Sequence, residues 1–139
     1  MSLFVLDTDT LVLFQEGHEV VCRHVLSHPM EELAISVITV EEQLSGWYTL
    51  LRRAKSAQKL ASAYQRLADS ILLLSQFRIL SFTESAIAEF QQLKTRKLGV
   101  KHMDIRIAAI ARDHAGTLVT RNLRDFQRIP GLAIEDWSN

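Results

Sequence analysis

The sequence of 139 residues has little of what anchors or cross-links a small protein. Its single cysteine, Cys22, excludes an intrachain disulfide and fits a reducing compartment. No apolar stretch approaches the roughly 18 to 20 residues of a membrane span, and no basic segment with an apolar core marks a secretion signal near residue 1. We therefore expect a cytoplasmic protein that has no membrane partner.

Proline and glycine are also scarce, with two and five residues respectively. Because no segment is rich in Pro, Gly or Ser, we expect no linker, and residues 1–139 are predicted to form a single domain. The sixteen Lys and Arg equal the sixteen Asp and Glu in number, so the net charge attracts neither nucleic acid nor an anionic membrane. A nucleic-acid partner would have to bind a local basic cluster.

The chain does contain short apolar runs that alternate with amphipathic stretches. The runs predict strands at 3–6, 33–37, 77–80, 117–120 and 132–134. The amphipathic stretches predict two short helices within 10–28, broken near Gly17, and helices over 56–71, 83–97 and 104–114. This alternation is typical of an α/β fold, a three-layer α/β/α sandwich with a central parallel sheet. Ligands of such sheets bind beyond the carboxyl ends of the strands.

Acidic residues follow the predicted strands: Asp7 and Asp9 after the first, Glu41 and Glu42 after the second, Asp104 before the fourth and Asp125 after it. Carboxylates gathered at one edge of a sheet repel one another and need a compensating cation. Oxygen ligands alone favour Mg²⁺ or Mn²⁺ over zinc, and Cys22 and the five histidines do not have the spacing of a zinc site.

Several of these acids also have purely structural interpretations. Residues 39–42 match a capping box with Thr39 as the N-cap, in which Glu42 would bind backbone N–H groups. Asp104 suits the first turn of a helix, and Asp125 would cap a short turn over 123–127. Asp7 has no helix to cap unless Thr8 or Asp9 takes that part, which favours a functional role for Asp7.

Four segments, at 6–10, 36–46, 99–109 and 120–126, resemble the signature blocks of PIN domains. Their order and spacing are similar to those of VapC toxins, the ribonuclease halves of toxin–antitoxin pairs. This resemblance implies a PIN-like fold and an endoribonuclease that depends on Mg²⁺ or Mn²⁺. It implies a catalytic quartet of Asp7, Glu42, Asp104 and Asp125, with Asp7, Asp104 and Asp125 as metal ligands and Asp9, Thr120 and Asn122 as polar support. A non-acidic residue is usual at Glu41, and Glu42 is preferred because its spacing to Gly46 matches the family.

The resemblance also implies three partners: an RNA substrate, a VapB-like antitoxin and a second copy of the chain. An antitoxin segment would pack over helices near the active site. Its candidate contacts are apolar: Leu11, Val12, Phe14, Trp47, Leu50 and Leu51. Trp47 and Tyr48 could also stack on bases or fill the core.

Basic residues form three clusters. The first cluster has no acid among its members and comprises Arg52, Arg53, Lys55, Lys59 and Arg66. The second precedes Asp104 and comprises Lys94, Arg96, Lys97 and Lys101. The third flanks Asp125 and comprises Arg121, Arg124 and Arg128. Each could contact phosphates, and the alternatives are a solvated helix face or simple balance of the acidic charge. We expect Lys97, Lys101, Arg121 and Arg124 to contact RNA.

Two other functions compete with the nuclease. Asp7, Thr8 and Asp9 also resemble the nucleophile motif of haloacid-dehalogenase-like phosphatases, in which the first Asp attacks phosphorus. A PIN-like domain that binds RNA or protein without catalysis is the second alternative. Activity on small phosphate monoesters would indicate the first, and absence of metal-dependent RNA cleavage the second.

Overall fold

A computed structural model describes residues 2–139 and contains one sheet of five parallel strands. The strands are β1 (Phe4–Leu6), β2 (Leu33–Ser36), β3 (Arg78–Leu80), β4 (Thr117–Val119) and β5 (Ala133–Glu135). They lie in the order β3-β2-β1-β4-β5. The chain order reverses between β1 and β4, and such a switch point is where ligands of open parallel sheets bind.

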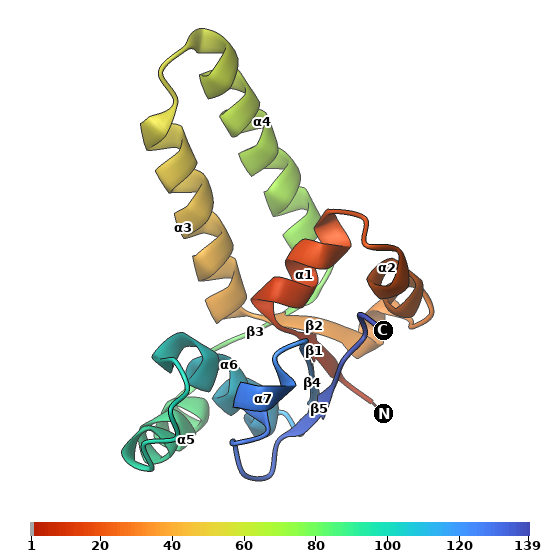
Figure 1. Cartoon of the computed structure of the whole chain (residues 1–139), viewed down its shortest axis with the longest axis vertical. Coiled ribbons are helices and arrows are strands. Elements are labelled where there is room, and N and C mark those ends of the chain that lie inside the picture. Colours follow the sequence, from red (N-terminus) through yellow and green to blue (C-terminus); the bar gives the residue numbers. More distant parts are fainter. Residues whose placement is uncertain (1) are drawn as a thin grey trace.

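Helices cover both faces of this sheet, so the predicted three-layer α/β/α sandwich is confirmed (Figure 1). The helices are α1 (Thr8–Gln15), α2 (Glu19–Leu26), α3 (Val37–Arg53), α4 (Ala57–Leu74), α5 (Glu84–Thr95), α6 (His102–Asp113) and α7 (Leu123–Phe126), with a 3-10 turn, η1, at Met30–Glu32. None of the helices in residues 2–139 is both long and apolar enough to cross a membrane.

The strand residues alternate between two apolar cores. Val5 and Leu118 point to the core that contains α5 and α6, where Ile107 is fully buried. Leu6 and Val119, their neighbours in the chain, point to the core on the opposite face, which contains α1, α2 and the end of α4. Successive side chains of a strand face opposite sides of a sheet, which is why these strands are apolar at consecutive positions.

Helices α3 and α4 form an antiparallel hairpin that extends away from the sheet (Figure 1). We call residues 37–74 the arm. Ser56 caps α4 by accepting a hydrogen bond from the backbone N–H of Lys59. Most side chains of α4 are exposed, and only Ala63, Ser70 and Leu74 are buried. The arm therefore offers a long surface to a partner.

The start of α3 differs from the predicted one. Helix α3 begins at Val37 and its N-cap is Ser36, whose Oγ accepts a hydrogen bond from the backbone N–H of Thr39 over 3.2 Å. The predicted cap at Thr39 is therefore wrong, because β2 ends at Ser36 and leaves Thr39 inside the helix, fully buried. Glu42 is thus in the second turn of α3, and its carboxylate is free of any capping role.

Candidate active site

Asp7 lies at the carboxyl end of β1, in the middle of the sheet, and is only 6% exposed. Its Oδ1 accepts a hydrogen bond from the backbone N–H of Thr10 over 2.8 Å, so Asp7 is the N-cap of α1. The prediction that Asp7 has no helix to cap is wrong, since α1 follows β1 without an intervening loop. A capping role does not exclude a functional one, because a carboxylate has a second oxygen.

Some groups around Asp7 raise its pKa and others lower it. Burial raises the pKa of Asp7, while hydrogen bonds from Thr120 and Thr10 lower it and the negative charge of Asp9 raises it. Thr120 is fully buried, and its Oγ1 also accepts a hydrogen bond from the backbone N–H of Asn122 over 2.9 Å. The predicted supporting residue Thr120 thus connects the loop after β4 to Asp7.

Asp104 occupies the first turn of α6 and is half-buried. Burial is the main reason that its pKa is raised, and the negative charges of Glu42, Asp7 and Asp125 raise it further, while Lys101 lowers it. Four acids from four separate segments therefore lie within electrostatic range of one another. These are the four acids of the predicted quartet.

Glu42 is held by a hydroxyl group of α1. Thr8 donates a hydrogen bond from Oγ1 to Oε1 of Glu42 over 2.7 Å, and the same Oγ1 is 3.0 Å from Oγ1 of Thr39. Glu41 is exposed and borders a surface hollow that it shares with Tyr48. Of the two adjacent glutamates, Glu42 is the one that faces Asp104.

Asp125 lies in α7, and Asn122 is the N-cap of that helix. Asn122 accepts a hydrogen bond from the backbone N–H of Asp125 at 3.4 Å and donates one from Nδ2 to Oδ2 of Asp125 at 3.0 Å. The predicted capping role of Asp125 is therefore wrong, and its carboxylate is positioned by Asn122 instead. Arg128 Nη1 lies 3.8 Å from Oδ1 of Asp125.

Comparison with known proteins decides the family. The model of the PIN domain matches residues 4–132. The chain belongs to the PIN domain family. It is 30% identical to the tRNA(fMet)-specific endonuclease VapC of Salmonella typhimurium, over 99% of both chains. It is 32% identical to Toxin FitB of Neisseria gonorrhoeae, over 97% of this chain and 99% of FitB.

Solved structures agree with this assignment. The structure of DNA-bound VapBC from Salmonella typhimurium matches with a TM-score of 0.80 at 28% identity, over 99% of both chains. The resemblance to VapC-type PIN domains is thereby confirmed. The match to the PIN model along nearly the whole chain also replaces the phosphatase resemblance, which rested on three residues near Asp7.

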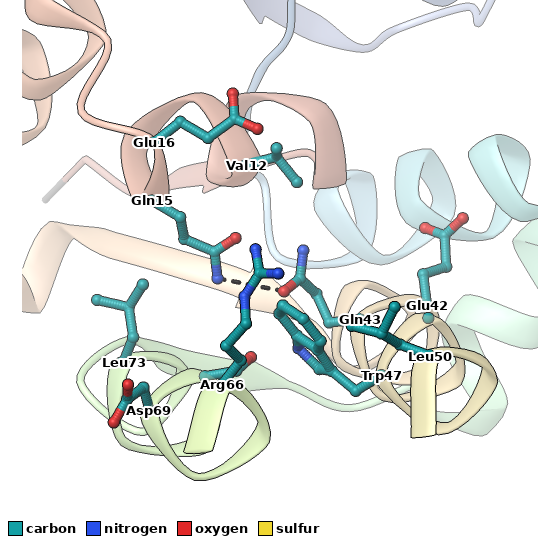
Figure 2. A pocket seen from close by; sticks show the side chains of 12 residues that line it. Val12, Gln15, Glu16, Glu42, Gln43, Trp47, Leu50, Arg66, Asp69 and Leu73 are labelled. Carbon is teal, nitrogen blue, oxygen red and sulfur yellow. Dashed lines mark hydrogen bonds between the residues drawn. The ribbon is translucent and has the colours of Figure 1, made fainter. Parts of the chain in front are cut away.

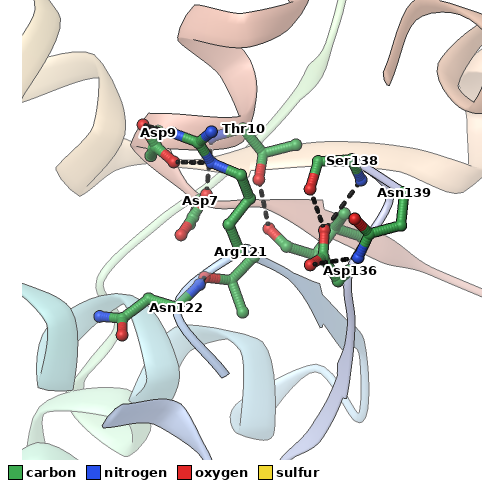
Figure 3. Close-up of polar contacts among 10 residues, drawn as sticks. Asp7, Asp9, Thr10, Arg121, Asn122, Asp136, Ser138 and Asn139 are labelled. Carbon is green, nitrogen blue, oxygen red and sulfur yellow. Dashed lines mark hydrogen bonds and ion pairs between the residues drawn. The ribbon is translucent and has the colours of Figure 1, made fainter. Parts of the chain in front are cut away.

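Beside the quartet of this PIN domain, Arg121 forms an ion pair with Asp9. Arg121 donates from Nε and Nη2 to the two carboxylate oxygens of Asp9, over 2.9 and 3.2 Å (Figure 3). The pair joins the first turn of α1 to the loop after β4, across the switch point of the sheet. Asp9 thus contributes to the arrangement of the site as a partner of Arg121.

The other predicted RNA contacts surround the site in different ways. Lys101 is the N-cap residue of α6, and its positive charge lowers the pKa of Asp104. Arg124 is exposed on α7, and Lys97 is exposed beyond the end of α5. Lys101 is thus the one of these three cations whose charge lowers the pKa of Asp104, and RNA contact stays a prediction for all three.

The donor set of the PIN domain suits a hard cation. Its four acids offer only oxygen atoms, the ligands that Mg²⁺ and Mn²⁺ prefer, and three of them raise the pKa of the fourth. In residues 2–139, no three His, Cys, Asp or Glu side chains lie close enough together to hold an ion as placed. Glu42 is turned to Thr8, and Asp125 to Asn122 and Arg128, so rotation of these side chains would accompany binding.

A groove of about 580 Å³ begins at Glu42 and runs between α1, α3 and α4 (Figure 2). Its walls are largely apolar, with Val12, Leu50 and Leu73, and the guanidinium of Arg66 lies 5.2 Å from the ring centre of Trp47. Among the described residues, Trp47 Nε1 and the buried Ser70 Oγ have no hydrogen-bond partner. Ser70 could not be predicted as a groove residue, because it is a single polar residue on the apolar side of an amphipathic helix.

Proposed function

We propose that this PIN domain is a metal-dependent endoribonuclease, the toxin half of a VapBC-type toxin–antitoxin pair. The observation that carries the proposal is the set of acids around Asp104: Glu42, Asp7 and Asp125 all raise its pKa, although they come from different segments of the chain. A fold without a function at this site has no reason to gather four mutually repelling carboxylates. Relatives named as VapC endonucleases support the same activity.

The proposed reaction is hydrolysis of an RNA phosphodiester, leaving a 5′-phosphate and a 3′-hydroxyl. A divalent ion, when bound, supplies a water of lowered pKa and positive charge for the phosphoryl oxygens. Asp7, Asp104 and Asp125 would hold that ion, and the scissile phosphate would then lie beside them, near the end of β1 and the first turns of α6 and α7. Glu42, held by Thr8, faces the same space and would orient the attacking water through a hydrogen bond.

Lys101 and Arg128 border the acids and would contact the substrate's phosphates. Lys101 lowers the pKa of Asp104, so its charge reaches the centre of the site. Arg128 lies 3.8 Å from Asp125 and also donates to the backbone oxygens of Leu98 and Gly99, over 3.5 and 3.4 Å. Arg128 is therefore held at the rim beside Asp125, where a polyanion would replace part of its contact with that acid.

The groove supports the second half of the proposal, an antitoxin partner. Structures similar to this chain are of VapBC complexes. Val12, Trp47 and Leu50, predicted as antitoxin contacts, line the groove. Leu11 does not, because it is fully buried, and Phe14 packs edge-to-face on Phe77 at 6.0 Å.

An antitoxin segment in the groove would meet two donors that lack acceptors within residues 2–139, Trp47 Nε1 and Ser70 Oγ. A buried donor without a partner costs free energy, so a bound segment that supplies carbonyl oxygens is favoured there. Because Glu42 lines the same groove, the segment would also reach the acids and block the RNA site. We further propose that the toxin forms a homodimer.

Cleavage of RNA by the purified, antitoxin-free protein tests this function. The substrate is a mixed pool that contains total tRNA, including initiator tRNA because the Salmonella relative is named for it. We expect site-selective cuts with Mg²⁺ or Mn²⁺, and none with EDTA or in Asp104→Asn. A folded protein that cleaves no RNA in this pool would indicate a PIN domain that only binds, and equal cleavage by Asp104→Asn would overturn the quartet.

A further inference from the structure

We propose that the tip of the arm is a second RNA-binding site, which holds the phosphates of a structured RNA at a distance from the cut. The inference rests on the proposed ribonuclease function and extends it. It concerns four cations near the arm tip and the hollow between the helices: Arg53, Lys55, Lys59 and Arg66. None of them belongs to the site around Asp104.

The arm separates charge within a chain that is neutral overall. From Gln43 to Ala68 there are five of the sixteen Lys and Arg and none of the sixteen Asp and Glu. The rest of the molecule consequently has an excess of five negative charges. A surface of one sign on an otherwise acidic protein attracts a polyanion to that surface alone.

The cations of the arm are available to a ligand. All five are exposed, including Arg52, and none forms an ion pair within the described residues. Arg52 donates only to Thr49 Oγ1, over 3.2 Å, and Arg66 lies over the ring of Trp47. Elsewhere in the molecule, Arg23, Arg121 and Arg128 do pair with acids.

A hollow of about 510 Å³ lies between α3 and α4 near the arm tip, and it gathers three of these cations, Arg53, Lys59 and Arg66. Its other lining residues are neutral: Leu50, Ala54, Gln58, Ser62 and Ala63. A concave surface that collects guanidinium and ammonium groups without an acid suits a phosphate group.

The length of the arm determines how far an RNA must extend from the active site to reach the tip. Arg53 lies eleven residues beyond Glu42 in α3. At about 1.5 Å per residue, Arg53 is roughly 16 Å farther along the helix axis than Glu42. A nucleic-acid strand with the B-form rise of about 3.4 Å per nucleotide needs on the order of five nucleotides to cover that distance. The substrate is therefore an RNA that continues at least about five nucleotides past the cut.

RNA is favoured over a protein partner by the chemistry of the tip. The apolar walls and the orphan donors that suit an antitoxin segment lie in the groove near Glu42. The hollow at the tip, by contrast, is lined by three cations and no acid, whereas Glu16, Glu42 and Asp69 line the groove. The two share only Leu50 and Arg66. One surface suits a peptide and the other suits a phosphate backbone.

The test measures RNA binding in EDTA, so that it does not depend on cleavage. Arg53→Gln with Lys59→Gln removes two cations from the tip, and Arg23→Gln with Arg78→Gln removes two exposed cations elsewhere as a matched control. The probe is total tRNA, titrated at several salt concentrations. We expect the tip variant to bind more weakly and to lower the slope of log K against log salt by roughly 2, and the control variant to keep the wild-type slope.

The outcomes separate this inference from the proposed function. If the tip variant keeps the wild-type salt slope, or if both variants lose the same RNA affinity, the RNA site on the arm is overturned even if the protein cleaves RNA. Loss confined to the tip variant supports it even if no cleavage is found with Mg²⁺ or Mn²⁺. If the tip variant binds tRNA normally but loses affinity for the antitoxin, the tip is a protein-binding surface and the inference is wrong. Unchanged thermal unfolding temperatures of both variants show that each is folded.

Discussion

The hydroxyl of Thr8 donates a hydrogen bond to Oε1 of Glu42 over 2.7 Å, which links the first turn of α1 to the second turn of α3. Thr39 is fully buried and its hydroxyl lies 3.0 Å from that of Thr8. Ser36 Oγ, which is also fully buried, is 3.5 Å from Thr39 Oγ1. Glu42 is therefore positioned by a short chain of hydroxyl groups that begins at the end of β2.

This relationship predicts that Thr8 is a positioning residue. Thr8→Ala removes a hydrogen bond to a charged group, and because such bonds contribute about 1.5 to 3 kcal/mol, we expect kcat for RNA cleavage to fall by at least about tenfold. KM should stay close to the wild-type value, since Thr8 does not contact RNA in the proposed complex. Thr8→Ser keeps the hydroxyl and should restore most of kcat. Equal rates in Thr8→Ala and Thr8→Ser would refute the positioning role.

The raised pKa of Asp104 predicts a stability gain on neutralising it. Because the pKa is above 3.8 in the folded protein, the folded state binds a proton more tightly than the unfolded chain does. The free energy of unfolding of the metal-free protein therefore falls as the pH rises from about 3.8 through the folded-state pKa. Asp104→Asn removes this loss, so at pH 7 in EDTA we expect its unfolding temperature to be higher by roughly 2 °C.

Calorimetry from pH 7 downward checks this prediction. The difference between Asp104→Asn and wild type should shrink as the pH falls to 3.8 and below, because the carboxyl then becomes protonated in the folded state and in the unfolded state. Glu41→Gln is the control, since it removes the same charge from an exposed position on α3. A destabilised Asp104→Asn at pH 7 would mean that its carboxylate makes a contact that outweighs the repulsion.

Metal binding should make the wild-type protein more stable than Asp104→Asn, which is the reverse of the order expected in EDTA. If Asp7, Asp104 and Asp125 hold a divalent ion, Mg²⁺ or Mn²⁺ stabilises the folded state in proportion to its binding, by about 2.7 kcal/mol at one hundred times Kd. We expect the wild-type unfolding temperature to rise with added Mn²⁺ and that of Asp104→Asn to stay unchanged. Ca²⁺ and a matched ionic strength of NaCl serve as controls, and equal increases with NaCl would refute a specific site.

Much of the site could be predicted because parallel strands bring their carboxyl ends to one edge. Asp7 and Asp125 are far apart in sequence, but each follows a strand, and β1 lies beside β4 in the sheet. Asp104 was placed by its helix, which begins two residues earlier at His102. The convergence of these acids thus depends on topology, and the alternation of strands and helices was enough to predict a parallel sheet, although not its strand order.

Local capping could not be predicted in the same way. Ser36 and Thr39 are both suitable N-cap residues, and only the end of β2, set by pairing with β1 and β3, decides between them. The Thr8–Glu42 contact depends on how α1 and α3 approach each other, which no periodicity in either segment encodes. The burial of the Ser70 hydroxyl could not be predicted either, since it depends on which neighbours the arm packs against.

Ser70 supplies the last prediction, because its role should differ between the free toxin and the complex. Its Oγ is buried and has no hydrogen-bond partner among the residues that the structure describes. Ser70→Ala therefore removes an unpaired polar group and should leave the free protein as stable or more stable, by up to about 1 kcal/mol. If an antitoxin carbonyl accepts from Ser70, the same variant should weaken the complex about fivefold, since bonds of this kind contribute about 1 kcal/mol. Ser62→Ala, exposed on the same helix, is the control for both measurements. Thermal unfolding of the free toxin and calorimetric titration with the antitoxin would measure the two effects, and unchanged affinity in Ser70→Ala would place the antitoxin segment outside this part of the groove.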